Sequence, residues 1–287
     1  MTGASGAAPP PPDGGTAFAT PTGEGFADAV TLAWGDPGSE VYGLARIGVT
    51  PPTASALGVL FSGGEVVASV AEGAAELSAS DWSSVRAGAL EIVTEEPHGA
   101  WRLRWDGEAD LLFTAVSPAV EVRGGGMEGH ERLCRVEGTV GGRRTSCLGQ
   151  RGRSWGVADW DRVALARTLS AWWDEDRALV LGAVRPAKAR DHAGEEVVAW
   201  LLDADADPAR VAEPRLSTTY DGEGRQRRAG LELYVSGDDD EFPRRVAGEV
   251  ACGTSLELGR LRLDCAFFHW RTEGRAGVGR YDVLRRA

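Results

Sequence analysis

The sequence of 287 residues contains a single lysine, Lys188, so the other 30 of its 31 basic residues are arginines. Its formal net charge of −12 disfavours binding to nucleic acid, because neutralising phosphates needs a basic face. No apolar run approaches the roughly 20 residues of a membrane-spanning helix. The first residues also lack the basic and apolar regions of a secretory signal. We therefore expect a cytoplasmic protein with no membrane span and no nucleic-acid partner.

Cysteine and histidine are scarce, with four residues of each. Their spacings match no metal-binding motif, so we expect no metal and no cofactor. Without a secretion signal the cysteines are expected to be reduced and buried. A turn at Leu258-Gly259 would place Cys252 opposite Cys265.

A second hairpin is predicted to turn at Gly141-Gly142. In that register Cys134 lies opposite Gly149. Cys147 then lies opposite Val136, so the two thiols are diagonal neighbours and not a direct cross-strand pair.

Glycine is abundant, with 39 residues, and apolar residues alternate with polar ones over short stretches. In "WRLRW" (101–105) the two tryptophans and the leucine share one face, and the two arginines share the other. Asp106-Gly107 and Ser62-Gly63-Gly64 then provide hairpin turns. Short strands separated by such turns, without regular helices between them, are typical of antiparallel barrels or sandwiches. The sequence therefore predicts an all-β fold with little helix.

A glycine-rich break, "RGGGMEG" (123–129), separates two strand-rich halves. We predict a disordered Pro/Gly-rich tail over 1–22, an N-terminal β domain over 23–125 and a C-terminal β domain over 126–287. The segment 161–184 has some helical character, but its apolar residues also share one face of a strand. We expect it to form a hairpin.

The ten tryptophans are the most unusual feature of the composition. A barrel interior lined by indole rings suits a large apolar or polyene ligand, although the rings could equally fill a core. As ligand-binding candidates we take five tryptophans and a histidine in an aromatic strand. They are Trp101, Trp105, Trp155, Trp160, Trp173 and His269.

The stretch "GQRGRSWGVADW" (149–160) concentrates arginine, tryptophan and aspartate after a predicted strand. Arg151 and Arg153 could anchor the polar end of a ligand. A carboxylic acid kept protonated beside tryptophans could donate a proton to an alkene or a carbonyl, and Asp159 and Glu131 are the nearest candidates. The alternative is a tight corner in which Trp155 plugs a barrel end and Arg151 binds carbonyl oxygens.

The block "HERLCRVEGTVGGRRTSCLGQRGRSWGVADW" (130–160) resembles a block in bacterial proteins related to carotenoid hydratases of the hydroxyneurosporene synthase type. The same superfamily includes decalin-forming cyclases, the Diels–Alderases of polyketide pathways. The resemblance implies two lipocalin-like antiparallel barrels in tandem. The matching positions are Gly149, Arg151, Ser154, Trp155, Gly156, Asp159 and Trp160.

The chain departs from this block in the turn itself. Relatives often carry Asp-His before Ser-Trp-Gly, where this chain has Gly152 and Arg153. Pro-Arg often follows, where this chain has Val157 and Ala158. If the turn supplies a proton in relatives, another carboxylate serves here or the site does no acid chemistry.

We expect an enzyme of secondary metabolism that hydrates, isomerises or cyclises a C=C system in a hydrophobic polyene, isoprenoid or polyketide-like molecule. The alternative is a non-catalytic carrier of a hydrophobic small molecule. A third possibility is a structural protein whose barrels are filled by their own side chains.

Overall fold

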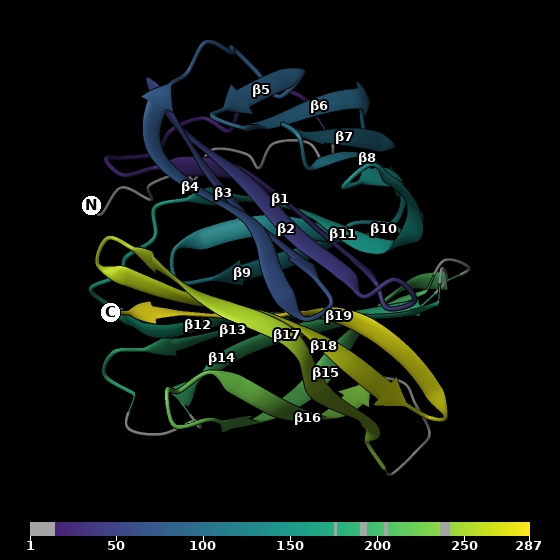
Figure 1. The fold of residues 1–287 in the computed structure, drawn as a ribbon. Helices are drawn as coiled ribbons and strands as arrows, with labels where there is room; N and C mark the ends of the chain where they lie inside the picture. The colour runs from purple at the N-terminus through teal and green to yellow at the C-terminus, as the bar shows by residue number, and fades with distance from the viewer. Residues whose placement is uncertain (1–14, 175–176, 190–193, 204–205, 236–241) are drawn as a thin grey trace, which may run out of the picture.

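The computed structural model describes residues 15–174, 177–189, 194–203, 206–235 and 242–287. Within these residues the chain forms nineteen β-strands and no α-helix. The strands form two antiparallel units that lie one above the other in Figure 1. The prediction of an all-β fold made of two tandem lipocalin-like barrels is confirmed. Among the described residues, no helix has the length and apolar character needed to cross a membrane.

The first unit is an eleven-stranded sheet in the order β4-β3-β2-β1-β11-β10-β8-β7-β6-β5, with β9 paired to β10. Its two edge strands, β4 and β5, contact each other, so the sheet is a nearly closed barrel. The strands are β1 (Ala27–Asp36), β2 (Val41–Thr50), β3 (Thr53–Ser62), β4 (Glu65–Glu76), β5 (Ser84–Ala87), β6 (Leu90–Glu96), β7 (Ala100–Trp105), β8 (Ala109–Ala115), β9 (Val120–Gly124), β10 (Met127–Val140) and β11 (Arg143–Gly156).

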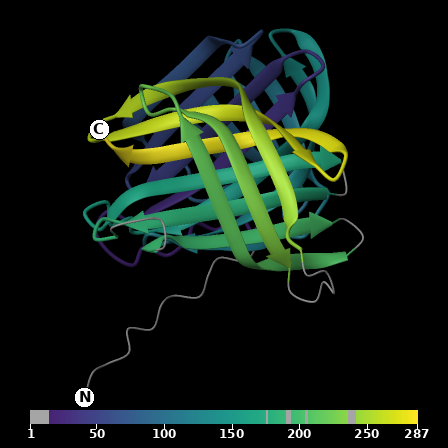
Figure 2. The ribbon, with the colours of Figure 1, turned by 90° about the horizontal axis from the view of Figure 1, so that it is seen from below.

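The second unit is a closed barrel in which each strand pairs with the next and β19 pairs with β12. Figure 2 shows this barrel from below. The strands are β12 (Val163–Asp174), β13 (Arg177–Pro186), β14 (Glu196–Asp203), β15 (Ala206–Tyr220), β16 (Gln226–Val235), β17 (Arg244–Leu258), β18 (Leu261–Thr272) and β19 (Arg275–Arg286). The predicted hairpin over 161–184 is present as β12 and β13, and residues 175–176 of its turn lie outside the described residues.

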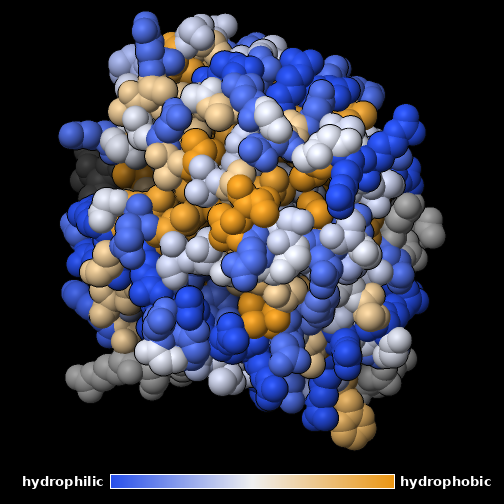
Figure 3. Space-filling model, viewed as in Figure 1, coloured by the Kyte–Doolittle hydropathy of each residue, from blue (hydrophilic) through white to orange (hydrophobic). Residues whose placement is uncertain are grey.

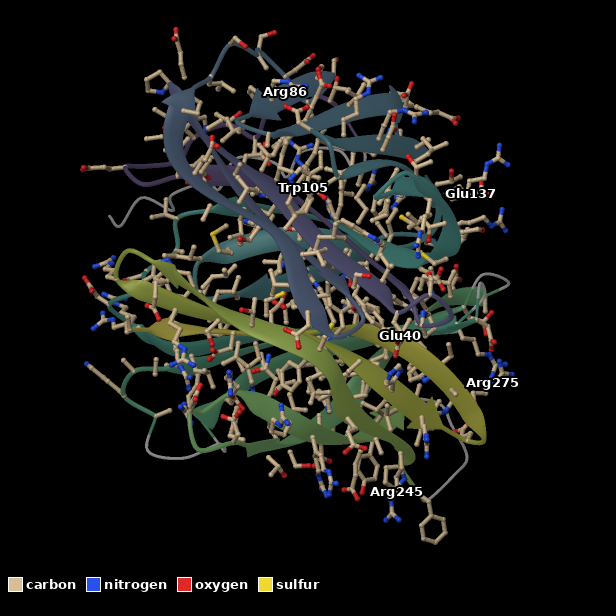
Figure 4. The ribbon with its side chains drawn as sticks, in the orientation of Figure 1. Glu40, Arg86, Trp105, Glu137, Arg245 and Arg275 are labelled. Atoms are coloured by element: carbon tan, nitrogen blue, oxygen red, sulfur yellow. The ribbon has the colours of Figure 1, made fainter. Side chains whose placement is uncertain are left out.

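The alternating pattern of the sequence decides which side chains fill the first barrel. Trp101, Leu103 and Trp105 of β7 are buried, whereas Arg104 is exposed. Trp105 points into this barrel (Figure 4), where its ring packs over the backbone of Gly58 in β3. A Cβ atom on Gly58 would lie 2.9 Å from that ring, so the indole takes the place of a side chain there.

The register of the β10–β11 hairpin agrees with the prediction. Gly141 and Gly142 form the turn with φ of 55° and 75°, values that favour glycine. Cys134 pairs with Gly149, and Cys147 pairs with Val136.

The predicted register of the β17–β18 hairpin is wrong. Cys252 pairs with Phe267 and not with Cys265. The turn lies one residue later than expected, because Gly259 supplies the left-handed φ of 64° and Leu258 still pairs with Leu261. All four cysteines are free thiols.

The chain passes from the first unit to the second between Gly156 and Val163. The boundary expected at 125/126 falls instead inside the first sheet, between β9 and β10, which pair with each other. Gly125 and Gly126 have φ of 62° and 86° and form a hairpin turn, so the glycine-rich stretch connects paired strands.

Part of the expected N-terminal tail lies against the first barrel. Residues 1–14 are outside the described residues, but Ala17 forms a β-bridge with Asp81. The backbone of Thr16 accepts a hydrogen bond from the backbone N–H of Trp82. Residues 15–19 therefore form a short segment, here called the strap, that is held on the barrel.

Candidate functional site

The outer face of the first sheet packs against the outer wall of the second barrel, and we call this contact layer the seam. β1 contacts β19 there, β9 contacts β13 and β14, and β4 contacts β17. Figure 3 shows hydrophobic residues gathered across the middle of the molecule, where the two units meet. The buried apolar residues of the seam include Tyr42, Phe61, Leu133, Trp172, Phe267 and Val278.

One transverse row of the first sheet brings polar side chains into the seam. Glu131 of β10 pairs with Gly152 of β11, which pairs with Thr31 of β1. Thr31 in turn pairs with Arg46 of β2. These four residues, here called the polar row, lie side by side across four strands and face the second barrel.

The two rows of residues that flank the polar row on the same face of the sheet differ in the size of their side chains. The row towards the seam core is largely apolar and consists of Leu133, Gln150, Ala33, Leu44 and Val59. The row on the other side contains nothing larger than serine and consists of Gly129, Ser154, Ala29, Gly48 and Ser55. Ser55 is exposed and Gly48 and Ser154 are half-buried, whereas Ala29 and Gly129 are buried, so this row is open to solvent only in part.

Glu131 is held from both units. The amide of Gln150 donates to Oε2 at 2.5 Å, and Nη2 of Arg280 in β19 lies 3.5 Å from Oε1. Burial raises the pKa of Glu131, an effect that the positive charge of Arg280 partly opposes. The side chain keeps 11% of its surface accessible, so the carboxyl group borders a space that water can enter.

Arg280 also contacts a second carboxyl group. Its Nη1 lies 3.5 Å from Oδ2 of Asp282. Burial raises the pKa of Asp282, against the effects of Arg280 and of a hydrogen bond from Cys265. One guanidinium of the second barrel therefore lies between two carboxyl groups, one from each unit.

Arg46 lies at the other end of the polar row. Its Nη1 donates to Oγ1 of Thr31 at 2.8 Å, and Nη1 and Nη2 both lie 3.4 Å from Oγ of Ser154. Burial, and then the nearby charge of Arg280, lower the pKa of Arg46 to about 10. The guanidinium is still charged at neutral pH.

This arrangement combines the parts needed for acid–base chemistry on an apolar molecule. A buried carboxyl group with a raised pKa holds a proton more readily than an exposed one and can donate it to a substrate. A second carboxyl group on the far side of Arg280 can accept one. Two guanidinium groups can stabilise negative charge, and the apolar residues of the seam exclude water.

The other predicted residues lie elsewhere. Arg151 and Trp101 do meet, with the guanidinium 4.8 Å from the ring centroid, but inside the first barrel. Trp105 belongs to the same interior cluster. Trp173 lies inside the second barrel. These residues are thus separated from Glu131 by a sheet or a barrel wall.

Arg153 anchors the strap. Its Nε and Nη2 donate to Asp28 at 3.0 and 2.7 Å, and Nη1 and Nη2 donate to the carbonyl oxygens of Gly15 and Ala17. Asp28 accepts further hydrogen bonds from the backbone N–H of Ala19 and from Nε1 of Trp82. Arg153 therefore binds carbonyl oxygens at this corner, which is the kind of contact that the structural alternative expected of Arg151.

Trp155 closes the same end of the barrel, where it packs with Phe26 and Ala19. Asp159 lies in the connection between the two units, with 48% of its side chain exposed and Arg162 at 3.2 Å. The carbonyl oxygen of Trp160 accepts hydrogen bonds from Arg286.

Of the predicted site residues, Glu131 belongs to the polar row and His269 lies at the rim of the seam. The His269 ring is exposed and lies 6.4 Å from the ring of Tyr42. Sequence reasoning missed Arg46, Gln150, Arg280 and Asp282. A signal was present in β19, where Arg280 and Asp282 alternate with the buried Tyr281 in a strand that is buried on both faces.

Residues 16–287 match the family described as "Domain of unknown function (DUF7064)". The chain belongs to this family. No curated protein matches the DUF7064 chain.

Two solved structures share the fold of this DUF7064 chain. Kievitone hydratase from Nectria haematococca is 12% identical, with a TM-score of 0.61, over 90% of this chain and 88% of that one. CghA is 11% identical, with a TM-score of 0.59, over 95% of this chain and 94% of that one. At these identities the likeness concerns the fold.

Proposed function

We propose that this chain is a secondary-metabolism enzyme that protonates a C=C system of a hydrophobic unsaturated small molecule in the seam. The reaction is a hydration, isomerisation or cyclisation without a cofactor, and Glu131 is the proton donor. The observation that carries this proposal is the contact of Arg280 with both Glu131 and Asp282, in a buried site that water can reach.

The position of Glu131 supports its role as the acid. In the resembling family block, an aspartate often occupies the position of Gly152. A Cβ atom on Gly152 would lie 2.4 to 2.7 Å from the carboxyl atoms of Glu131. Glu131 thus places a carboxyl group, from the neighbouring strand, in the space that a side chain at position 152 would use.

A hydration can be balanced with these groups. Glu131 transfers its proton to one alkene carbon, and the electron pair of the double bond forms the new C–H bond. Water adds to the other carbon and loses a proton to Asp282. Transfer of that proton from Asp282 to Glu131 through water returns the site to its starting state.

An isomerisation uses the same first step, after which a neighbouring C–H gives its proton to Asp282. In a cyclisation, a second double bond attacks the carbocation and the new carbocation loses a proton to Asp282, or the seam folds the substrate without net proton transfer. Orientation alone can contribute on the order of 7–11 kcal/mol in the best cases. The likeness in fold to a protein named as a hydratase supports the hydration among these alternatives.

The test is turnover of a panel of polyenes, terpenes and linear polyketides in water enriched in oxygen-18 and, separately, in deuterium oxide. Hydration would add one labelled oxygen, and isomerisation would exchange deuterium into the product. Glu131→Gln should lower turnover at least about 100-fold. The matched control is Glu137→Gln, an exposed residue of the same strand that lies at the margin of the molecule in Figure 4.

Binding of the panel with every ligand recovered unchanged would contradict the proposal and favour a carrier. The variant Asp159→Asn tests the other candidate acid, Asp159, against Glu131. Loss of turnover in Asp159→Asn with full activity in Glu131→Gln would move the acid out of the seam.

A further inference from the structure

We infer that the seam recognises substrates that carry an ionised acid group, a carboxylate or an enolate, and that Arg46 binds this group. The inference rests on the proposed function only in taking the polar row as the substrate site. It names a substrate class and a specificity residue that neither the sequence motifs nor the comparisons indicate.

The half-buried Arg46 differs in its partners from three buried arginines of the chain. Arg153, Arg167 and Arg280 each pair with a carboxylate. The hydrogen bonds of Arg46 within the described residues go only to the hydroxyl groups of Thr31 and Ser154. A guanidinium presents five N–H donors in a planar fork that matches a carboxylate, and hydroxyl groups use this capacity poorly.

The charges around the polar row point to a missing anion. Asp28 lies on the opposite face of the sheet, where Arg153 and Trp82 bind it. Glu131 and Asp282 each lie 3.5 Å from Arg280, so both carboxyl groups pair with that one guanidinium. Among the described residues no carboxyl group forms a salt bridge with Arg46, whose hydrogen bonds go to hydroxyl groups, and an acidic substrate would supply the missing carboxylate.

The spacing of the strands fits such a substrate. Glu131 and Arg46 are three strands apart, and neighbouring strands lie about 4.8 Å from each other, so their backbones are about 14 Å apart. The side chain of Glu131 covers Gly152 and that of Arg46 lies against Thr31, so the two side chains extend towards each other along the row. An acid group bound by Arg46 would bring the unsaturated carbons next to it within reach of Glu131.

The surroundings of Arg46 also suit the two ends of an amphipathic molecule. The adjoining small-residue row is exposed at Ser55, on the strand next to that of Arg46, so a charged group could stay hydrated there until it meets Arg46. The opposite row leads into the apolar part of the seam, which would bury the hydrocarbon part of the substrate.

The test compares sorbate, a six-carbon diene acid that is ionised at neutral pH, with its uncharged methyl ester. Isothermal titration calorimetry measures the binding of each compound to the full chain. We expect the native protein to bind sorbate about tenfold or more tightly than methyl sorbate, as for a hydrogen bond to a charged group. Arg46→Gln, which can still bind Thr31 and Ser154, should abolish this preference by weakening sorbate binding alone. Arg46→Lys should retain part of it.

The matched control is Arg228→Gln on the outer wall of the second barrel, where Arg228 is 72% exposed and pairs with Glu249. This variant should keep the full preference for the acid. Equal binding of acid and ester by the native protein, an unchanged preference in Arg46→Gln, or no binding of sorbate at its solubility limit would overturn the inference.

The same titration separates this inference from the proposed function. Glu131→Gln removes the proton donor but should keep the preference for sorbate over its ester. If that preference holds while no compound is ever turned over, the acid-binding role of Arg46 stands and the enzymatic proposal fails. If acids and esters are turned over equally and Arg46→Gln does not change turnover, the enzymatic proposal stands and the acid-binding role of Arg46 fails.

Discussion

The carboxyl group of Glu131 lies over the backbone of Gly152, and a Cβ atom on Gly152 would come within 2.4 Å of its Oε2 atom. The two residues pair directly across β10 and β11, so neither can change without affecting the other. The glycine gives the carboxyl group its room, and the carboxyl group fills the space that the glycine leaves.

This relationship predicts that the acid can be moved across the strand pair. Glu131→Ala should lose turnover, because no carboxyl group remains to donate the proton. Adding Gly152→Asp to that variant should restore a measurable part of it, because the new carboxyl group enters the same space. Gly152→Asp alone should be less active than the double variant, because it places a second carboxyl group in the space that Glu131 already occupies. Absence of any rescue in a folded double variant would speak against this exchange of positions.

Gly152→Ala should destabilise the protein by about 1–3 kcal/mol, because the added methyl group displaces the buried Glu131 and its hydrogen bond from Gln150. Urea unfolding measures the change. The matched control is Gly182→Ala in β13, where a Cβ atom would meet nothing within 4 Å and the change should stay within about 0.5 kcal/mol. Equal changes in the free energy of unfolding for the two substitutions would show that a methyl group at position 152 does not displace Glu131.

Glu131 should make stability depend on pH with a definite sign. Its pKa is raised above the usual 4.5, so the folded state binds this proton more tightly than the unfolded state. The stabilising contribution is complete below the unfolded pKa and is lost as the pH rises through the folded pKa. In urea unfolding across this range, the native protein should lose stability relative to Glu131→Gln as the pH rises. Turnover should fall over the same range, because the donor loses its proton. A difference in stability that does not change with pH would mean that the pKa of Glu131 is not raised.

Arg153→Met should cost about 3–5 kcal/mol, because it leaves the buried Asp28 without its cation. The two side chains are only 5% and 2% exposed. The strap should also become sensitive to protease, since Arg153 binds the carbonyl oxygens of Gly15 and Ala17. Arg228→Met, which breaks a pair that is 72% and 68% exposed, should cost about 1 kcal/mol or less. A small effect of Arg153→Met would show that the strap does not depend on this pair.

Local patterns in the sequence determined the fold class and many of its hairpins. Alternation of period two placed Trp101, Leu103 and Trp105 in one core, since successive side chains of a strand point to opposite faces. Glycine pairs at Gly63-Gly64 and Gly141-Gly142 set the turns, and the strands pair directly on either side of them, Ser62 with Glu65 and Val140 with Arg143. The β17–β18 register was wrong because its turn contains one glycine, and this glycine is the first residue of the turn and not the second, so Leu258 pairs with Leu261.

Only the tertiary structure shows what surrounds each candidate residue. Glu131 could be named as a candidate acid from its place near the tryptophan-rich turn, but our proposal of Glu131 over Asp159 rests on the fold. The pairing of β1 with β11 brings Thr31 and Arg46 into one row with Gly152 and Glu131, and the packing of the second barrel adds Arg280, which is 149 residues from Glu131. Such distant pairings depend on how whole sheets curl and pack. Alternation within a single strand tells which face a side chain shares, and carries no information about which distant strand will cover that face.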